Sequence, residues 1–510
     1  MIKERSNSMQ FLVNMAAAFM TFVVGLGIRF VLTPYIVRTL GTEAYGFIGL
    51  SSNILSYTGL VTIALNSMAG RFVTIKYSAG DVESANKYYA SVFYSNSILA
   101  AVILLFSIGC VTWLEYMIDI PESLVFDVKL LFALLAINNI IGLVFGIWGV
   151  STFIRNRIDL SNIRGIIGNF MNVAILVALF SLFAPHIWYM GVAGFVMTIY
   201  TTWTNRRFAR LLTPDLVVKR SNFEWGKVVE LQKSGAWNLV SKLGEILGQG
   251  LDLLIANVCI GATAMGYFAL TKNVPFLILS LFQTISGVFA PILTNLYASG
   301  NIVSLISEFK KSIRILGFFT TFPLAILYVW GNDFYSLWLP TEDSNELQTL
   351  TILSTLGMVF SMPLESLWNI FTITNKLKVS TMVQFCYNIV VLVTVLISVL
   401  FTDDIKFRLY ILAGTRTLIG ITRSLLFLPI YGSYCLDLPK ITFYKPLIKS
   451  STALLVVCIL SFIIKQFFVI ESWFTFGIVC IITIALCVLV NYKLILLNSD
   501  IVFVKKVLHL

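Results

Sequence analysis

The sequence predicts an all-α polytopic membrane protein with about 14 transmembrane helices. Apolar runs of roughly 20 residues recur along the whole chain, and a helix of that length spans the ~30 Å hydrocarbon core of a bilayer. Because the runs lack the alternation of β-strands, helices are the structure that satisfies their backbone groups in lipid. The composition agrees, since 58% of the residues are hydrophobic and 12% are charged, against about 25% charged residues in soluble domains.

The first predicted span follows the segment MIKERSNSMQ and lacks an A-x-A-like cleavage site. We therefore interpret it as a retained helix and not as a signal peptide. The predicted spans, in chain order, cover residues 11–36, 44–69, 88–112, 126–152, 163–184, 187–205, 234–258, 265–297, 312–332, 347–374, 379–401, 407–431, 446–468 and 472–495.

The charge of the connections alternates along the chain. Lysine and arginine gather in every second connection, and acidic residues dominate most of the others. Because basic loops stay on the cytoplasmic side of membrane proteins, both termini are predicted to be cytoplasmic. This pattern explains the net charge of +11 without nucleic acid as a partner. The predicted cytoplasmic set includes Lys3, Arg5, Arg71, Lys76, Arg155, Arg157, Arg206, Arg207, Lys310, Lys311, Lys376, Lys378, Lys440 and Lys505.

The longest connection, residues 206–233, divides the chain into two similar parts. We expect an N-terminal six-helix bundle (1–205), a basic cytoplasmic linker (206–233), a C-terminal six-helix bundle (234–431), and two further helices with a cytoplasmic tail (432–510). Residues 225–231 of the linker are amphipathic and are expected to lie on the inner leaflet.

A shift of 220 residues aligns the two bundles without gaps. It pairs LGTEAYGFIGLSSNI (40–54) with IGATAMGYFALTKNV (260–274). Six helices in each half place both halves in the same orientation, so the repeats are predicted to be parallel, with a pseudo-twofold axis along the membrane normal and a central cavity between them. The matched pairs include Gly41/Gly261, Ala44/Ala264, Gly46/Gly266, Asn53/Asn273 and Gly80/Gly300.

The sequence argues against an enzyme. The seven cysteines form no CxxC pair and lie mostly in apolar runs, which is typical of small core residues. The two histidines lie in a loop and near the C-terminus, and neither a Ser/His/Asp trio nor a G-x-x-x-x-G-K-[ST] loop is found. No catalytic residue, metal or cofactor is therefore predicted.

Charged residues inside the predicted spans indicate where a ligand binds. A charge at the bilayer centre costs about 2.5–3.5 kcal/mol by insertion scales, so such residues are usually paired or functional. Cations predominate, and Arg29, Lys242, Lys272 and Arg416 are the candidates for binding substrate. A cationic cavity favours an anion, and arginine and lysine bind diphosphate well.

The acidic residues in the spans are candidates for ion coupling or for pairing with the cations. They are Glu245, Asp252 and Glu365. Lys242 and Glu245 can neutralise each other, Asp252 can pair with Lys272, and Arg423 is interpreted as reaching towards the interface. Spacings of 4, 3, 4 and 3 predict one helical face for Asn238, Lys242, Glu245, Gln249 and Asp252. The predicted polar lining of the cavity comprises Asn238, Gln249, Asn53, Asn273 and Asn369.

The phrase R-x-L-G-x-x-x-Y-G (Arg38, Leu40, Gly41, Tyr45, Gly46), its echo at 260–270 and the 6+6+2 arrangement resemble the polysaccharide flippases, O-antigen type, of the multidrug/oligosaccharidyl-lipid/polysaccharide (MOP) exporter superfamily. The resemblance covers nearly the whole chain. It implies alternating access around a central cavity in the bacterial inner membrane. The implied substrate is an undecaprenyl-diphosphate-linked oligosaccharide, moved from the cytoplasmic to the outer leaflet for O-antigen, capsule or exopolysaccharide. The implied partners are membrane lipids, glycosyltransferases and a polysaccharide polymerase, with a proton, sodium or the membrane potential as driving force.

Three alternatives stay open. A multidrug/cation antiporter of the same superfamily is expected to carry an essential carboxylate among its first-half helices, whereas Asp127 lies near the outer end of its span. A lipid II flippase is expected to carry more first-helix arginines than Arg29 alone. A non-transporting scaffold for glycosyltransferases does not need the polar face predicted around Lys242.

Overall fold

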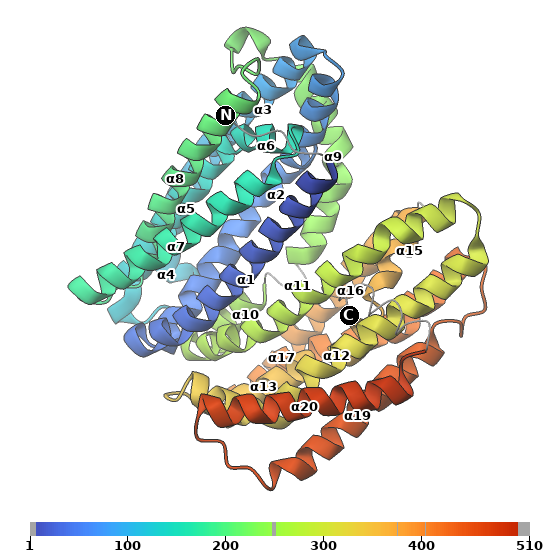
Figure 1. Cartoon of the computed structure of the whole chain (residues 1–510). Helices are drawn as coiled ribbons and strands as arrows, with labels where there is room; N and C mark the ends of the chain where they lie inside the picture. Colours follow the sequence, from blue (N-terminus) through green and yellow to red (C-terminus); the bar gives the residue numbers. More distant parts are fainter. Residues whose placement is uncertain (1–6, 247–250, 375, 403, 498–510) are drawn as a thin grey trace. The chain divides into compact units, whose positions relative to one another are not determined.

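The computed structural model describes residues 7–246, 251–374, 376–402 and 404–497, and every regular element in these ranges is helical (Figure 1). The chain forms two compact units, unit 1 up to Gly266 and unit 2 from Tyr267 onward. Unit 1 contains α1 (Asn7–Leu40), α2 (Thr42–Ser78), α3 (Val82–Thr112), α4 (Leu114–Met117), η1 (Glu122–Leu124), α5 (Val125–Phe145), η2 (Gly146–Gly149), α6 (Val150–Ile154), α7 (Ile158–Leu182), α8 (Tyr189–Leu212), η3 (Arg220–Asn222), α9 (Trp225–Glu245), α10 (Asp252–Cys259) and the start of α11 (Ala262–Ala298).

Unit 2 is built around the long helix α12. Two red helices in Figure 1, α19 and α20, pack along it and against each other. Besides the rest of α11, the unit contains α12 (Ile302–Trp338), α13 (Ser344–Thr355), α14 (Met358–Ser361), η5 (Glu365–Leu367), α15 (Trp368–Ile373), α16 (Leu377–Leu400), α17 (Ile405–Thr422), the π-helix η6 (Arg423–Phe427), α18 (Leu428–Cys435), α19 (Tyr444–Lys465) and α20 (Trp473–Leu494).

All fourteen predicted spans fall on helices within the described residues. By length and composition, ten helices qualify as membrane spans, or twelve when two sharply bent pairs each count as one span. The predicted spans at 187–205 and 234–258 correspond to α8 and to α9 with α10, which are not among those twelve. Both regions carry many polar residues. The chain is therefore an all-helical polytopic membrane protein with 10–12 candidate spans.

The 220-residue repeat has a direct counterpart in the backbone. Helices α2 and α11 both contain 37 residues and begin 220 positions apart. The glycines that the described part holds at positive φ form two pairs at the same offset, Gly41 with Gly261 and Gly80 with Gly300. A positive φ is accessible to glycine because it lacks a Cβ. The matched glycines therefore mark matched helix boundaries.

The first turns of α2 and α11 touch at equivalent positions of the repeat. A Cβ added to Gly46 would lie 2.9 Å from the Cα of Gly266, and one added to Gly266 would lie 2.5 Å from the carbonyl oxygen of Thr42. Next to this contact, the hydroxyl of Thr263 donates to the carboxylate of Glu43, which is again its partner at an offset of 220. Contacts between equivalent residues are the property of a twofold crossing. Small residues allow such a close backbone approach between helices in membranes.

The linker packs on unit 1. Val228 and Leu231 of α9 are buried in a cluster with Tyr88 and Tyr89 of α3, whereas Trp225 at the start of the helix is exposed. Asn86 of α3 holds the non-helical segment before η3. Its side-chain amide donates to the backbone carbonyl of Asp215 (3.0 Å), and its side-chain oxygen accepts from the backbone amide of Val217 (2.7 Å). Helices α9 and α10 thus belong to compact unit 1.

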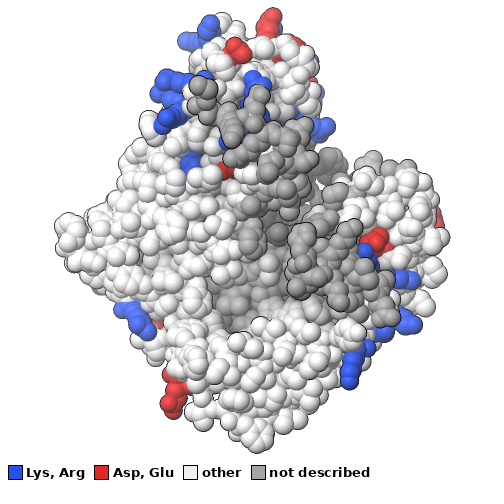
Figure 2. Space-filling model, in the orientation of Figure 1, with Lys and Arg blue, Asp and Glu red and all other residues white. Residues whose placement is uncertain are grey.

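The loops of unit 1 separate into two ends as their charges predict. At one end, Arg155 donates to the carbonyl of Leu212 (2.9 Å) and lies over the ring of Tyr77, while Lys87 pairs with Glu224 (2.9 Å). These contacts join three connections predicted to share the cytoplasmic side. Figure 2 shows lysine and arginine side chains gathered at the end of unit 1 near α3 and α6, with a largely uncharged surface below.

The acidic connections of unit 1 meet at the opposite end. The side chain of Asn257 accepts a hydrogen bond from the backbone amide of Asp119 (2.8 Å) and donates to its carbonyl (2.9 Å). The carboxylate of Asp127 contacts the imidazole of His186 at 2.9 Å. The charges therefore lie at the ends of the helices, as a bilayer-spanning unit requires.

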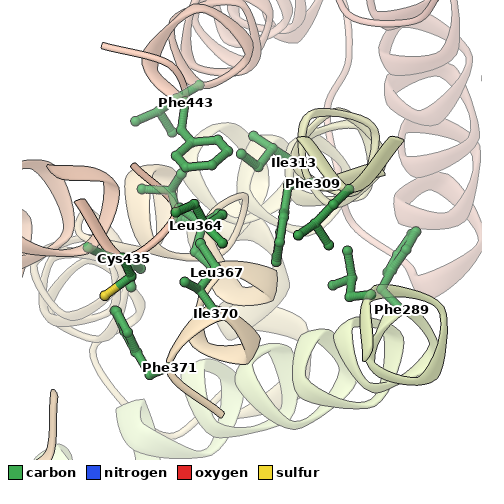
Figure 3. Close-up of a cluster of buried hydrophobic side chains, with 14 of the residues drawn as sticks. Phe289, Phe309, Ile313, Leu364, Leu367, Ile370, Phe371, Cys435 and Phe443 are labelled. Atoms are coloured by element: carbon green, nitrogen blue, oxygen red, sulfur yellow. The ribbon is translucent and has the colours of Figure 1, made fainter. Parts of the chain in front are cut away.

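The core of unit 2 forms where α12 meets the end of a broken helix (Figure 3). Phe309 of α12 and Phe371 of α15 are fully buried, and burial of such a side chain contributes about 1.5–3 kcal/mol. The segments Ser344–Ser361 and Glu365–Ile373 are bent by 56°. Pro363 lies in the break, where its ring prevents a continuous helix.

The glycine contact gives a sharp test of the fold. Gly266→Ala is expected to lower the stability of the protein by about 1–3 kcal/mol, since the new methyl group overlaps the backbone of Thr42. Gly287→Ala on the same helix is the matched control, because nothing in the described chain lies within 4 Å of its added Cβ. Thermal unfolding of the purified variants in detergent measures the difference. Equal melting temperatures for the two variants would contradict the close contact.

Candidate functional site

In unit 1, the predicted substrate-binding cation Arg29 lies on α1. Its side chain is exposed, four residues after Gly25 and two after Gly27. A Cβ added to either glycine would meet nothing within 4 Å in the described chain. Packing therefore does not require glycine there, and what glycine adds is freedom of the helix backbone. Pro34 further weakens the helix on the other side of Arg29.

The polar face predicted along residues 238–252 is described only at its two ends. Helix α9 runs to Glu245, and Asp252 begins α10. Because residues 247–250 lie outside the described part of the chain, the single helical face stays a prediction. Gln249 lies outside the described residues.

The described members of this face contact α2. The amide of Asn238 donates to the hydroxyl of Ser67 at 3.0 Å. Asp252 is buried and interacts electrostatically with Tyr57. Lys242 is half-buried on α9. Asn53 is also half-buried on α2, where its carbonyl accepts from Ser56 (2.6 Å).

Unit 1 contains an amide network that the sequence analysis did not identify. The side chains of Asn66 on α2 and Asn96 on α3 exchange two hydrogen bonds (3.2 and 2.9 Å), and Asn96 also donates to the carbonyl of Leu143 on α5 (3.0 Å). Asn139 of α5 donates to Thr58 of α2 at 2.7 Å. Interhelical hydrogen bonds of this kind connect membrane helices where hydrophobic association is weak. Isolated asparagines within apolar runs were the available sequence signal.

The same region contains a bend in α2. The segments Thr42–Leu60 and Leu65–Ser78 differ in direction by 60°. The hydroxyls of Thr58 and Thr62 donate to carbonyls of the preceding turn, at Leu55 (2.6 Å) and Gly59 (3.1 Å). Such bonds compete with the helix ladder and favour bending.

In unit 2, the sequence-predicted residues of α11 lie on its first half. The ammonium group of Lys272 lies 5.1 Å from the centre of the Phe268 ring, a cation–π distance. Asn273 makes a long hydrogen bond to the carbonyl of Leu270 (3.4 Å). Both side chains are half-buried.

Two predicted residues, Arg416 and Glu365, belong to a group around Arg423 that the sequence analysis did not identify. We call it the Arg423 cluster: Arg416, Arg423, Glu365, Gln384, Tyr387 and Trp368. The guanidinium of Arg423 lies 4.5 Å from the centre of the Tyr387 ring and 5.6 Å from that of Trp368, and it donates to the side-chain oxygen of Gln384. It interacts electrostatically with Glu365, which attracts it, and with Arg416, which repels it. Arg423 is therefore held by protein groups from three helical segments, and its position relative to the membrane interface stays a prediction.

The backbone around this cluster is irregular. Arg423 begins the π-helical turn η6, and Glu365 follows the 56° break of the preceding broken helix. Local π-helix is frequent at functional sites. The hydroxyl of Tyr387 donates to the carbonyl of Arg416 (3.1 Å), and the amide of Asn369 donates to that of Ser366 (3.0 Å).

The structure thus places Asn238 against Ser67, and places Arg423 within electrostatic range of both Glu365 and Arg416. Arg29, Lys242, Asp252, Asn53 and Asn238 belong to unit 1, while Lys272, Asn273, Arg416, Glu365 and Asn369 belong to unit 2. Glu245 lies at the end of α9. The binding of one anion by Arg29, Lys242, Lys272 and Arg416 together stays a prediction.

Comparison with known proteins identifies relatives of the whole chain. No family model matches the sequence. The chain is 28% identical over 471 residues to the uncharacterized membrane protein EpsK of Bacillus subtilis (strain 168), which covers 91% of each protein.

Solved structures show the fold. A multidrug resistance MATE family transporter of the MOP superfamily, in an inward-facing conformation, is similar with a TM-score of 0.67 and 13% identity, covering 84% of this chain and 98% of that one. The lipid II flippase MurJ, in an inward closed conformation, is similar with a TM-score of 0.66 and 14% identity, covering 97% of this chain and all of that one. The chain therefore has the fold of these MOP superfamily transporters.

The amide network of unit 1 predicts a specific pattern of stabilities. Asn96→Leu is expected to cost about 1–3 kcal/mol, because it leaves the amide of Asn66 unsatisfied inside the helix bundle. The double variant Asn66→Leu/Asn96→Leu is expected to be less destabilised than the sum of the two single variants, since no orphaned amide remains. Thermal unfolding of the three purified variants tests this coupling. Strict additivity would contradict the reciprocal pair.

Proposed function

We propose that this protein is a MOP superfamily flippase that moves undecaprenyl-diphosphate-linked oligosaccharides from the cytoplasmic to the outer leaflet of the bacterial inner membrane. The observation that carries the proposal is the Arg423 cluster in a chain with a MATE/MurJ-like fold. The guanidinium of Arg423 lies over the rings of Tyr387 and Trp368, and Arg416 precedes it by seven residues on the same candidate membrane span. Excess positive charge in that setting favours an anionic ligand. Arginine binds phosphate oxygens with parallel hydrogen bonds.

The similarity to EpsK supports an export role, and exopolysaccharide is the surface glycan that we favour. The proposed arrangement comprises 14 membrane helices with both termini in the cytoplasm. Two six-helix bundles alternate between inward and outward openings, and two C-terminal helices are additional. Arg29, Lys242, Lys272 and Arg416 bind the diphosphate and first sugars, while the lipid tail remains in the bilayer.

The membrane potential supplies a driving force in this proposal. Moving two negative charges outward across an inside-negative potential of 100 mV releases roughly 2 × 2.3 kcal/mol. Glu245, Asp252 and Glu365 are the candidates for additional coupling to protons or sodium.

The multidrug/cation antiporter is the second candidate, because the TM-score of the MATE transporter (0.67) is about the same as that of MurJ (0.66). The acidic residues of the first-half helices speak against it. Glu43, Glu83, Asp127 and Asp159 each lie in the first turn of their helix, and Asp159 is paired with Arg157 at 3.0 Å. MurJ also covers 97% of the chain, against 84% for the MATE transporter.

Deletion of the gene provides the direct test of the substrate class. A strain that lacks the protein is expected to accumulate a completed undecaprenyl-diphosphate-linked repeat unit and to lose a surface glycan. Mass analysis of extracted lipids identifies the accumulated species. Unchanged glycan and lipids, combined with increased sensitivity to cationic drugs, would instead establish the antiporter.

Complementation of that strain tests the cations. Arg29→Ala and Arg416→Ala are each expected to lower glycan export about tenfold or more, because each removes a charge-assisted contact worth about 1.5–3 kcal/mol. Lys493→Ala is the matched control, since this exposed lysine lies at the end of α20. Export is measured as surface glycan per cell at equal protein levels in the membrane. Full export by both arginine variants would refute the proposed binding residues.

A further inference from the structure

One face of the helix formed by α17, η6 and α18 carries a continuous row of cationic and aromatic side chains. The helix runs over Ile405–Cys435 and qualifies as a membrane span. Successive spacings of 4, 3, 4, 4 and 3 residues place the members of the row on the same side of the helix. The row consists of Arg416, Gly420, Arg423, Phe427, Tyr431 and Tyr434.

The aromatic rings of this row lie nearly parallel to one another. The ring centres of Phe427 and Tyr431 are 5.2 Å apart with an interplanar angle of 16°, and those of Tyr431 and Tyr434 are 5.9 Å apart with an angle of 23°. Trp368 and Tyr387 continue the aromatic surface around Arg423. At the other end, the ammonium group of Lys376 lies 5.3 Å from the centre of the Tyr434 ring.

A rigid support lies beneath the rings. Phe371 is fully buried in the core cluster of Figure 3, and its ring centre is 5.9 Å from that of Phe427 and 5.5 Å from that of Tyr431. Trp368 also packs on it, at 5.7 Å. Trp368, Phe427 and Tyr431 are half-buried, and Tyr434 is 65% exposed. The row therefore rests on the core with one side and leaves ring surface uncovered on the other.

The length of the row and the polar neighbours of Arg423 at one end of it distinguish this face from a lipid-facing aromatic belt. Belt residues gather at the membrane–water interface, whereas this row follows the helix for roughly 16 Å from Arg423 to Tyr434, at 1.5 Å per residue. Glu365 and Gln384 adjoin Arg423. Charged and amide groups of this kind face protein or water and not hydrocarbon.

We infer that this row is a binding track for the sugar rings of the transported glycan. A sugar ring is saturated, so its C–H faces can bury apolar surface against a flat aromatic ring, while the hydroxyl of a tyrosine can hydrogen-bond to the polar edge of the sugar. The arginines at one end suit the diphosphate, and the rings suit the sugars attached to it. In the ligand, the anionic group is followed by a chain of sugars, just as the arginines of the row are followed by aromatic rings. The inference rests on the proposed function and names the part of the substrate that unit 2 recognises.

The track extends towards Lys376, in a connection that the charge pattern assigns to the cytoplasm. Sugars therefore first meet Tyr434 and Tyr431, and the diphosphate reaches Arg423 and Arg416. Gly420 lies in the same row by its spacing. A Cβ added at this position would lie 3.1 Å from the hydroxyl of Tyr387. Glycine leaves room for that hydroxyl to reach the carbonyl of Arg416.

The test compares variants of the full-length protein in liposomes. The probes are the lipid-linked repeat unit isolated from the deletion strain and undecaprenyl-diphosphate-galactose, and oxidation by external periodate measures how much of each has crossed the bilayer. Tyr431→Leu/Tyr434→Leu is expected to slow transport of the repeat unit about fivefold, as loss of stacking predicts. Transport of the single-sugar lipid is expected to fall less. Tyr431→Phe/Tyr434→Phe is expected to recover most of the loss, because the rings remain.

Tyr492→Leu is the matched control, since Tyr492 is similarly exposed on α20 outside the track. Tyr434→Leu alone serves if the double variant does not fold, because its ring is mostly exposed. Equal transport of the repeat unit by the leucine variants and the control would overturn the track. So would an equal loss for the leucine and phenylalanine variants.

A second measurement separates failure of the track from failure of the flippase proposal. Saturation-transfer NMR with the free oligosaccharide, released from the lipid by mild acid, detects sugar protons that lie close to the protein. Transfer that is lost in Tyr431→Leu/Tyr434→Leu but kept in Tyr492→Leu supports the track even if the wild-type protein moves no lipid. Wild-type transport without such a difference supports the flippase and overturns the track.

Discussion

The close approach of α2 and α11 at Gly46 and Gly266 is the constraint on which the rest of unit 1 depends. Two backbones can meet at this distance because neither residue has a side chain. The contact fixes where α11 begins, and Asp119 adds to this by accepting a hydrogen bond from the amide of Ala262 (3.3 Å). The amide network between α2, α3 and α5 and the packing of α9 on α2 then complete the unit. Equivalent residues of the two repeats touch each other here. The 220-residue repeat of the sequence therefore also determines the geometry of this helix crossing.

Hydrophobic runs and loop charges were sufficient to predict the helical segments and the separation of the loops into two ends, since both follow from the thickness and polarity of a bilayer. The repeat was also accessible, because Gly41 and Gly261 are required by backbone conformation and not by packing alone. The division into units was harder to predict. The apolar side chain of Leu231 could be buried either in lipid or, as the structure shows, against α3. The amphipathic pattern of the sequence is the same in both cases and does not distinguish them.

Candidate residues were predicted from their charge and not from their surroundings. Ionic residues in apolar runs were therefore identified, whereas the uncharged side chains around them were missed. Arg416 and Glu365 were identified as ions in apolar runs, but the side chains that surround Arg423 were not predicted. Its position depends on Trp368 and Tyr387, which are 55 and 36 residues away in the sequence. The aromatic row was missed for a related reason, since phenylalanine and tyrosine in a membrane helix carry no signal until their neighbours are known.

The burial of the linker changes where the two parts of the chain are mechanically joined. Residues 206–233 join the two repeats of the sequence. Hydrogen bonds to Asn86 and Ser91 hold this segment on α3, so it cannot act as a flexible linker. The chain passes between the compact units within the first turns of α11, directly after Gly266. A helix transmits rotation and bending, whereas a loop transmits neither. The chain connection between the two compact units is therefore a helix and not a flexible loop.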